Sequence, residues 1–427
     1  MNAEYEIRRF EPAAPGEPGY PEATAWDSAV SFGFHEERST DERVQESIAR
    51  SRVDGAVYTG AYQTGQPAPY SLGSEVPVAT FGSQPSTLNI GFGRLLDAHL
   101  ITGVTVRTSH RRRGLLRRMM TEDLTLAKGN GIAIAALTAS EASIYGRFGF
   151  GVATTEQSIT VDTSAKFQLN NTPVGTVEVA DPTVLLELAP QVFARLHNEQ
   201  PGSIGRQEFY RQLAAGATSR EGGPDAKVKA ALHYALDGTV DGYVSYRFGG
   251  WDKTPATMEI VDLVAATPAA YLELWQYLAA IDLVERITWN EAPVDNPLTW
   301  ALTDPRCVAA ANPRDLLWLR ILDVRQALEA RAFAADGTLV LRVADGLGLT
   351  AGTFTIEVRD GAAQVSASTA APDLELDITA LSSIYLGAVN PVSLAAAGRV
   401  QEHTEGAAFL AARLFALERP AHCLTHF

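Results

Sequence analysis

The residues best suited to chemistry form one strongly basic segment. Residues 101–120, ITGVTVRTSHRRRGLLRRMM, contain six arginines and no acidic residue. A strand ending at Val106, a loop of arginines with Gly114, and a helix beginning there would leave unsatisfied backbone N–H groups at the helix N-terminus. Those N–H groups, the helix dipole and the guanidinium groups all attract phosphate. The segment therefore predicts a site for a pyrophosphate-bearing cofactor. It is not a nucleotide P-loop, because G-x-x-x-x-G-K is absent.

Further along the chain, a few groups could transfer protons. Tyr145 lies in SIYGRFGF, shortly after an apolar strand predicted at residues 132–137. The final residues, PAHCLTHF, are apolar and aromatic, which predicts a docked tail. His422 and His426 would share one face of a helix, but the glutamate of H-E-x-x-H is missing, so we predict no metal site. No G-x-S-x-G sequence supports a serine hydrolase.

Composition narrows the class of protein. The 427 residues include 35 basic and 50 acidic ones, a net charge of −15, which argues against nucleic acid and favours cationic ligands. No stretch approaches the roughly 20 apolar residues of a membrane helix, and the N-terminus lacks the apolar run of a signal peptide. Two cysteines, Cys307 and Cys423, are too few for a disulfide scaffold or a cysteine-based zinc site. A cytoplasmic enzyme or binding protein is expected, without a membrane partner.

The elements that must position the basic segment form a first domain, predicted at residues 1–162. Periodicity predicts a helix over 114–128, one or two helical turns at 143–148, and strands at 5–10, 55–62, 78–81, 88–92, 99–106, 132–137 and 149–161. A strand, a basic glycine loop, a helix and another strand, in that order, indicate an α/β domain.

Two more domains are predicted. Residues 163–311 repeat a similar order of elements, so we suspect an internal duplication; where the basic loop would fall, the sequence is VAATPAAYLELW, without arginine or glycine. If this is a copy, it has lost the anion site. Residues 312–427 begin with a strand at 316–321 and a helix at 324–332. Three strands of period two and helices at 380–386 and 407–414 follow, an α+β pattern.

Two motifs of the chain resemble those of a known family. VTVRTSHRRRGLLRRMM followed by ASEASIYGRFGFGVA resembles the acetyl-CoA motif of the GNAT acetyltransferases, and most of all the enhanced intracellular survival (Eis-type) N-acetyltransferases. The general motif R-x-x-G-x-(G/A) has a small residue where this chain has Leu116, and the Eis-type subfamily tolerates leucine there. The resemblance covers the whole chain and implies two tandem GNAT-like domains, the second degenerate, followed by a sterol-carrier-protein-like α+β domain.

The resemblance implies a role for each motif residue in binding acetyl-CoA. The backbone of Val104, Thr105 and Val106 is expected to pair with the pantetheine arm as an added strand would. The pyrophosphate is expected to be cradled by Arg112, Arg113, Gly114, Leu115, Leu116 and Arg117. Ser140 and Glu141 are expected to line the cofactor cleft near the thiol, and no metal is implied.

Acetyl transfer to an amine needs a base for the amine and an acid for the leaving thiolate. By resemblance the acid is Tyr145, with a packed core tyrosine as the alternative. The resemblance also implies that the base is the C-terminal carboxylate of Phe427, which burial would make more basic. Alternatively, Phe427 only packs against the core. We expect direct transfer in a ternary complex without an acetyl-enzyme, since Cys307 and Cys423 lie outside the motif.

The acceptor is the least defined part. The resemblance suggests an aminoglycoside, a polyamine or a protein lysine, and it implies a homo-oligomer, a hexamer in this family. Phe32 and Phe34 beside Glu36 and Glu37 suit a polycation, although they equally suit a solvated helix end. The competing hypothesis is a lipid or sterol carrier that uses the third domain, with an acetyl-CoA-gated regulatory first domain. Nucleic-acid binding through the arginines is discounted because of the acidic net charge.

Overall fold

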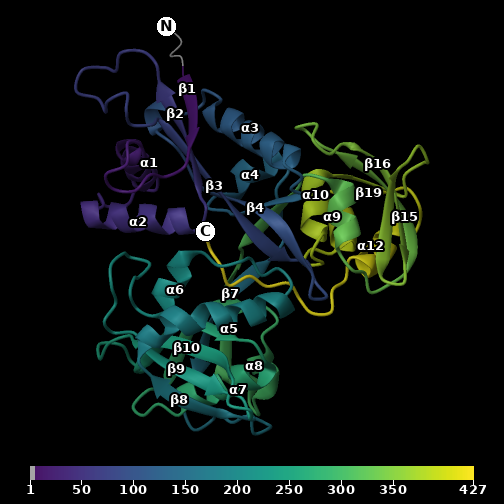
Figure 1. The fold of residues 1–427 in the computed structure, drawn as a ribbon. Coiled ribbons are helices and arrows are strands. Elements are labelled where there is room, and N and C mark those ends of the chain that lie inside the picture. Colours follow the sequence, from purple (N-terminus) through teal and green to yellow (C-terminus); the bar gives the residue numbers. More distant parts are fainter. Residues whose placement is uncertain (1–4) are drawn as a thin grey trace.

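The first domain is built on one mixed sheet with helices packed on it (Figure 1). The computed structural model describes residues 5–427. The strand order is β1-β2-β3-β4-β5-β14-β6, with bounds Tyr5–Phe10, Val57–Gln63, Ala79–Asn89, Leu95–Val106, Ile134–Thr138, Leu317–Ile321 and Gly151–Val152. Its helices are α1 (Tyr20–Gly33), α2 (Asp41–Val53), α3 (Leu115–Gly129) and α4 (Ala142–Tyr145). The predicted α/β class and the helix after the basic loop are confirmed.

One strand of this sheet was wrongly predicted as two. The strands predicted at 78–81 and 88–92 both overlap the single strand β3 (Ala79–Asn89), which runs through Pro85. Proline lacks the N–H that a central strand must donate, so it normally marks an edge. Here β2 pairs with β3 only as far as Ser83, whereas β4 pairs with it to Asn89. Pro85 therefore lies in the part of β3 that has a partner strand on one side only.

Two strands, β7 and β14, belong to a different sheet from the one that the sequence predicted for them. The strand predicted at 149–161 is in fact β6 in the first sheet and β7 (Thr155–Asp162) in the second. The strand predicted at 316–321 to open the third domain is β14, which lies between β5 and β6 of the first sheet. All residues of β14 are buried, and such a uniformly buried run carries no alternation that would identify its partners.

The second domain has the strand order β13-β7-β12-β11-β10-β9-β8. Besides β7, the strands are β13 (Val308–Asp315), β12 (Arg286–Pro293), β11 (Thr257–Ala265), β10 (Val240–Phe248), β9 (Lys229–Tyr234) and β8 (Thr176–Ala180). The helices are α5 (Leu185–Glu199), α6 (Glu208–Ala214), α7 (Pro268–Ala279) and α8 (Pro297–Ala301). The predicted hairpin around Asp237 and Gly238 is present as β9 and β10.

The third domain has a smaller sheet of order β17-β16-β15-β18-β19, with bounds Ala362–Ala367, Gly352–Arg359, Gly337–Ala344, Leu374–Asp377 and Val400–Glu402. Its helices are α9 (Val324–Ala330), α10 (Ile378–Ile384), α11 (Pro391–Ala396) and α12 (Ala407–Leu414). Strand β17 was not predicted from the sequence. The α+β prediction for this domain is confirmed.

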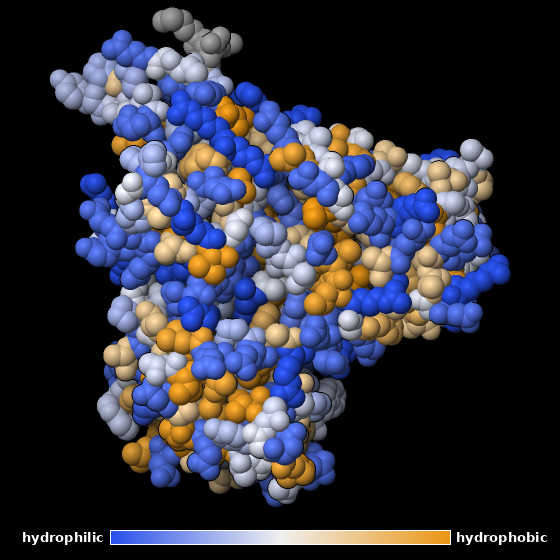
Figure 2. Space-filling model, in the orientation of Figure 1, coloured by the Kyte–Doolittle hydropathy of each residue, from blue (hydrophilic) through white to orange (hydrophobic). Residues whose placement is uncertain are grey.

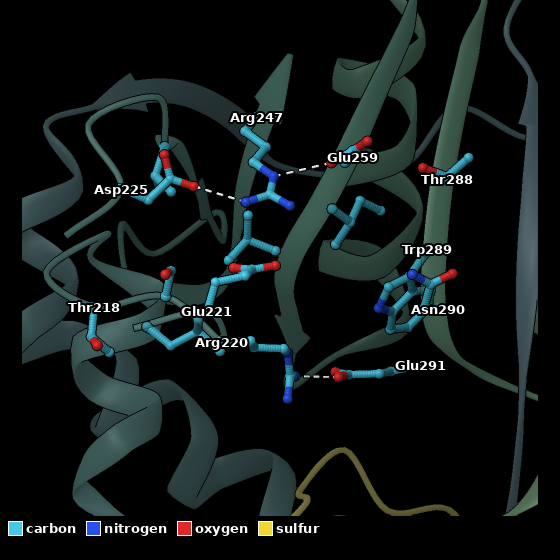
Figure 3. Close-up of a pocket in the computed structure, with 15 residues that line it drawn as sticks. Thr218, Arg220, Glu221, Asp225, Arg247, Glu259, Thr288, Trp289, Asn290 and Glu291 are labelled. Atoms are coloured by element: carbon cyan, nitrogen blue, oxygen red, sulfur yellow. Dashed lines mark hydrogen bonds and ion pairs between the residues drawn. The ribbon is translucent and has the colours of Figure 1, made fainter. Parts of the chain in front are cut away.

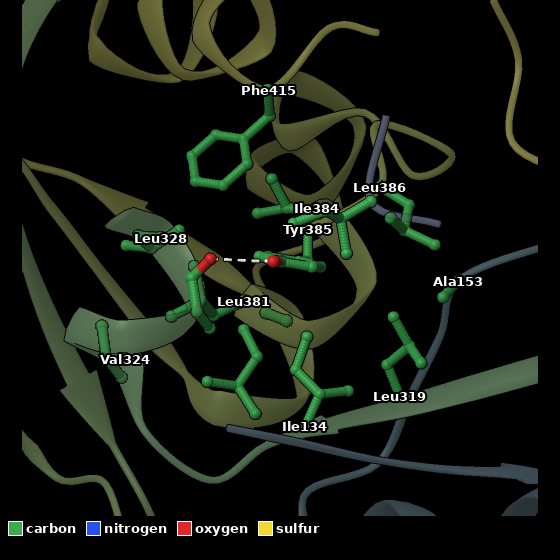
Figure 4. Packing of buried hydrophobic residues seen from close by; sticks show 14 of the residues in the cluster. Ile134, Ala153, Leu319, Val324, Leu328, Leu381, Ile384, Tyr385, Leu386 and Phe415 are labelled. Carbon is green, nitrogen blue, oxygen red and sulfur yellow. Dashed lines mark hydrogen bonds between the residues drawn. The ribbon is translucent and has the colours of Figure 1, made fainter. Parts of the chain in front are cut away.

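The first and third domains share one hydrophobic core (Figure 4). Ile134 of β5 and Leu319 of β14 belong to the same buried cluster as Leu381, Ile384 and Tyr385 of the third domain. The period-two residues Leu339, Leu341 and Val343 belong to it as well. Those apolar strands are therefore accounted for by an ordinary packed core.

The face of the molecule drawn in Figure 2 carries both hydrophilic and hydrophobic side chains. Figure 2 shows hydrophilic side chains over α2 and hydrophobic ones gathered on the second domain, where Trp251 and Trp300 are both more than 70% exposed. Within residues 5–427, no helix combines the length and apolar character needed to cross a membrane.

The shared core predicts that the first and third domains unfold together. Leu381 is completely buried, and truncating such a leucine to alanine costs about 2–5 kcal/mol through lost burial and the cavity that remains. We expect Leu381→Ala to lower the temperature of one common calorimetric transition of both domains. Phe409→Ala, at a 64% exposed position of the same domain, is the control and should change little. Separate transitions, only one of them shifted, would contradict the shared core.

Candidate active site

The site begins where two neighbouring strands part. Strands β4 and β5 pair in parallel from Ala98↔Ile134 to Ile101↔Leu137. Beyond Ile101, β4 continues to Val106 beside β3 but without β5. Backbone groups of residues 104–106 on that side are thus left without a strand partner, and an extended ligand can supply one.

The end of helix α1 closes one side of this opening. A Cβ atom at Gly33 would lie only 2.4 Å from the Thr105 Cβ, so the absence of a side chain lets α1 approach β4. The next residue, Phe34, is 44% exposed and lies on the wall of the cavity described below. Sequence reasoning placed Phe34 at a helix end, and the structure confirms that position.

The basic loop leads to an uncapped helix N-terminus. Gly114 is the N-cap of α3 and has a φ of +77°, which residues with a side chain rarely adopt. No side chain caps the helix, and its first turn contains no acid. Within residues 5–427, the side chains of Arg112 and Arg117 make no hydrogen bond or ion pair, whereas Arg113 donates to the Tyr5 hydroxyl at 2.7 Å. Free N–H groups and unpaired guanidinium groups are the groups with which proteins bind phosphate.

A cavity of about 770 Å³ joins the strand opening to this helix. Its lining contains all of the predicted cofactor residues and the predicted acid: Val104, Thr105, Val106, Arg112, Arg113, Gly114, Leu115, Leu116, Arg117, Ser140, Glu141 and Tyr145. The chain also contributes residues that sequence reasoning missed, including Ile144, Phe148, Gly346 and Leu347. The last two come from the third domain. Phe427 is not part of this lining.

Tyr145 lies at the end of α4, on the wall of the cavity, and is 6% exposed. Burial raises the pKa of its phenol, and this effect outweighs the opposing hydrogen bond with the Ser140 side chain. A raised pKa keeps the phenol protonated at neutral pH, as a general acid must be.

The C-terminal tail ends beside the same opening, in the middle of the molecule (Figure 1). Thr138, the last residue of β5, donates through its hydroxyl to a terminal oxygen of Phe427 at 2.6 Å. The same hydroxyl accepts from the Phe427 N–H at 3.3 Å. Because Thr138 lies two residues before Ser140, the terminal carboxylate is fixed next to the segment that contacts Tyr145. The expectation of a docked tail is confirmed.

The second domain fixes the rest of the tail. The Tyr210 hydroxyl donates to the His426 carbonyl at 3.2 Å, and Arg206 donates to the Leu424 carbonyl at 3.3 Å. The tail has no helix, so the condition under which His422 and His426 would share a helical face is not met. His422 is buried, and burial lowers its pKa to about 4. The described residues contain no group of three His, Cys, Asp or Glu side chains that could hold a metal.

Two buried carboxylates that sequence reasoning missed lie next to the tail. His426 Nε2 is 3.3 Å from Glu156 Oε1 and 3.9 Å from Glu291 Oε1. Glu291 pairs with Arg220 at one end of a cavity of about 360 Å³ in the second domain, and Figure 3 shows the tail passing beside that pair. Burial raises the pKa of Glu291. For Glu156, His426 and Arg314 outweigh burial and lower the pKa.

The second domain carries a counterpart of the strand opening without an anion site. Strands β11 and β12 pair in parallel only from Thr257 to Glu259, and helix α7 follows β11. At the start of α7 the Thr267 side chain accepts from the Ala270 N–H at 3.2 Å. A capped N-terminus without arginine has little affinity for phosphate, as expected for a degenerate copy.

Comparisons with known proteins agree with this architecture. Models described as "Acetyltransferase (GNAT) domain" match residues 23–153 and 202–325, and one described as "Sterol carrier protein domain" matches residues 324–424. An uncharacterized N-acetyltransferase from Streptomyces avermitilis is 36% identical over 91% of this chain and 93% of that protein. N-acetyltransferase Eis from Mycobacterium tuberculosis is 35% identical over 75% of this chain and 81% of that protein.

The solved structures give the same result. The crystal structure of Eis1 from Mycobacterium abscessus aligns with a TM-score of 0.82 at 28% identity and covers 99% of this chain and all of that one. An open strand pair, an uncapped basic helix N-terminus, two GNAT domains and a sterol-carrier-like domain occur here in one chain. The chain therefore belongs to the Eis-type GNAT N-acetyltransferases, and it is an acetyltransferase enzyme.

Proposed function

We propose that the protein transfers acetyl directly from acetyl-CoA to a cationic amine, with the Phe427 carboxylate as base and Tyr145 as acid. The observation that carries the proposal is the pair of hydrogen bonds between Thr138 and Phe427. These bonds hold a carboxylate at the end of β5, two residues before Ser140, which lines the cavity together with the α3 N-terminus and Tyr145. The family relationship independently supports acetyl-CoA as the donor.

In the proposed reaction, the amine nitrogen attacks the thioester carbonyl carbon while the Phe427 carboxylate accepts a proton from that nitrogen. The carbon–sulfur bond then breaks, and the Tyr145 phenol gives its proton to the leaving thiolate. The cofactor's pyrophosphate would lie on Arg112, Arg117 and the first N–H groups of α3, with pantetheine beside Val104–Val106. Holding both reactants in one site lowers the entropic part of the barrier.

The cysteines favour direct transfer over an acetyl-enzyme. Burial raises the pKa of the Cys423 thiol to about 12 and also raises the pKa of Cys307. A cysteine nucleophile must ionise to react, so neither thiol is activated. Neither residue lines the proposed acetyl-CoA cavity.

A cationic acceptor is supported by charge and by the cavity wall. The chain carries a net charge of −15, which attracts cations to the molecule. Phe34 reaches the cavity wall, and the exposed Glu36 and Glu37 follow it. We therefore propose aminoglycosides, polyamines and lysine side chains as acceptor classes, to be separated by measuring thiol release from acetyl-CoA with each. The homohexamer implied by the family stays a prediction.

The lipid-carrier hypothesis has no comparable support. Its motivation was the period-two apolar strands, and their inward residues belong to the packed core shared with the first domain. The family assignment makes the chain an acetyltransferase.

The role of the terminal carboxylate predicts the behaviour of three C-terminal variants. Deleting Phe427, or adding one glycine after it, should lower kcat by about 10²- to 10⁴-fold, the usual contribution of a general base. Both changes move the carboxylate away from Thr138. Phe427→Leu keeps the carboxylate and is the matched control, so it should retain most turnover. Thiol release reports turnover, and calorimetric titration should show unchanged acetyl-CoA binding. Full activity of the glycine-extended chain would rule out the carboxylate as base.

The role of Tyr145 predicts a selective loss of the chemical step. Tyr145→Phe should lower kcat by about 10²-fold or more, because the thiolate loses its proton donor, while acetyl-CoA affinity stays at the wild-type value. Since burial raises the pKa of this phenol, any alkaline decline of wild-type kcat that it causes should disappear in the variant. Tyr234→Phe, on strand β9, is the control. An unchanged kcat and pH profile for Tyr145→Phe would make this residue a packing tyrosine.

A further inference from the structure

The second domain has a strand opening that lacks the groups of a phosphate site. Strands β11 and β12 pair in parallel only as far as Glu259↔Thr288, and β11 continues from there to Ala265, paired with β10. Helix α7, which follows β11, is capped by Thr267 and contains no basic residue. A segment of peptide, which carries no phosphate, suits such an opening better than a nucleotide cofactor does.

The C-terminal tail lies at this opening. Leu424 is buried in the same cluster as Leu263 of β11 and Trp289 of β12. Both of these partners lie beyond the last parallel pair of the two strands. The tail therefore packs into the core of the second domain at the place where its strands have parted.

A buried arginine joins the opening to the backbone of the tail. Arg206 makes two hydrogen bonds to the carboxylate of Asp262 on β11, at 2.7 and 2.8 Å, and both side chains are at most 7% exposed. The same guanidinium lies 4.4 Å from the centre of the Tyr210 ring and donates to the Leu424 carbonyl at 3.3 Å. Because a carboxylate and an aromatic ring fix the guanidinium, the tail meets a donor whose position is set in advance.

The last peptide group of the chain is held by two domains. The Tyr210 hydroxyl accepts from the His426 N–H at 2.5 Å and donates to the carbonyl of the same residue at 3.2 Å. The Thr138 hydroxyl accepts from the Phe427 N–H at 3.3 Å. The His426 carbonyl and the Phe427 N–H belong to one planar peptide group. The second domain thus holds one edge of this plane and the first domain holds the other, so together they set the direction of the terminal carboxylate.

Tyr210 is itself well fixed. It lies on α6, and the carboxylate of Asp54, the C-cap of α2 in the first domain, accepts from the Glu208 N–H at the start of α6 at 2.8 Å. Tyr210 is 2% exposed. Burial raises the pKa of its phenol, so the hydroxyl keeps the proton that it donates to the tail.

We infer that the strand opening of the degenerate second domain holds the catalytic tail, with Tyr210 and Arg206 as positioning residues for the Phe427 carboxylate. This inference rests on the proposed function, in which that carboxylate is the base. Tyr210 does not line the cavity assigned to acetyl-CoA, and it acts on the reaction through the last peptide group. The second domain thereby takes part in catalysis although it lacks an anion site.

The first test removes one hydroxyl group. Tyr210→Phe loses both contacts with His426 but keeps the ring beside Arg206. We expect kcat to fall by about tenfold or more, because a small displacement of a catalytic group is costly, while the KM for acetyl-CoA stays at the wild-type value. Tyr246→Phe is the matched control, since this buried phenol of the same domain bonds the Tyr277 hydroxyl at 2.6 Å instead of the tail. It should keep wild-type kcat.

Two further readouts separate positioning from a merely structural role. In a chain that lacks Phe427, Tyr210→Phe should lower kcat no further, because the group that it positions is gone. Carboxypeptidase Y should release the terminal phenylalanine of Tyr210→Phe several-fold faster than that of wild type or Tyr246→Phe, since the tail leaves its site more often. Arg206→Lys, which cannot bind Asp262 through two parallel bonds, should also speed this release. Thermal unfolding confirms that each variant is folded.

The outcomes distinguish this inference from the proposed function. Wild-type release of phenylalanine from Tyr210→Phe would overturn the inference, because the second domain would then not hold the tail. The same fractional loss of kcat with and without Phe427 would also overturn it, because Tyr210 would then act on something other than the carboxylate. Full activity of the chain that lacks Phe427 would instead overturn the proposed base, whatever the release rates are.

Discussion

The proposed active site depends on the early end of pairing between β4 and β5. The last parallel pair is Ile101↔Leu137, and only five residues of β4 lie beyond it. These residues keep β3 on one side and expose backbone hydrogen-bonding groups on the other, which a buried strand cannot leave unsatisfied without a partner. The same divergence ends β5 at Thr138, the residue that holds the tail. The docked carboxylate and the free strand edge proposed for the ligand thus follow from one feature of the sheet.

The position of that carboxylate is defined by two domains together. Second-domain residues at positions 201–210 hold the tail from His422 to His426, and Thr138 of the first domain holds Phe427. Such an arrangement requires the two domains to keep a fixed relation. Two short connections keep the domains in this relation, because β6 of the first sheet leads directly into β7 of the second, and β13 of the second leads directly into β14 of the first. A hinge between the domains would move the carboxylate relative to Tyr145.

The sequence alone supported the parts of the site that are contiguous in the chain. The strand, the loop with Gly114 and helix α3 follow each other, so their physics is visible in one segment. The contacts of Phe427 with Thr138, and of Asp345 with Arg320, join residues separated by 289 and 25 positions and leave no local pattern. For the same reason the sequence did not reveal that β7 belongs to the second sheet and β14 to the first. Tyr145 and the tail could be proposed from family resemblance, whereas Leu347 had no sequence signal.

The two GNAT domains show how little separates a phosphate site from an ordinary helix start. The N-cap of helix α3 is Gly114, a glycine of positive φ that offers no side-chain acceptor, so the first N–H groups of the helix stay available beside Arg112 and Arg117. The N-cap of helix α7 is Thr267, whose hydroxyl accepts a hydrogen bond from the Ala270 N–H and donates one to the Asp241 carboxylate. The threonine stabilises α7 by about 1 kcal/mol, and the nearby carboxylate repels a phosphate. Because α3 lacks such a cap, its N-terminus is less stable alone and gains most from an anion. The missing side-chain cap therefore leaves the first N–H groups of α3 free for an anion, although it would weaken the same helix in isolation.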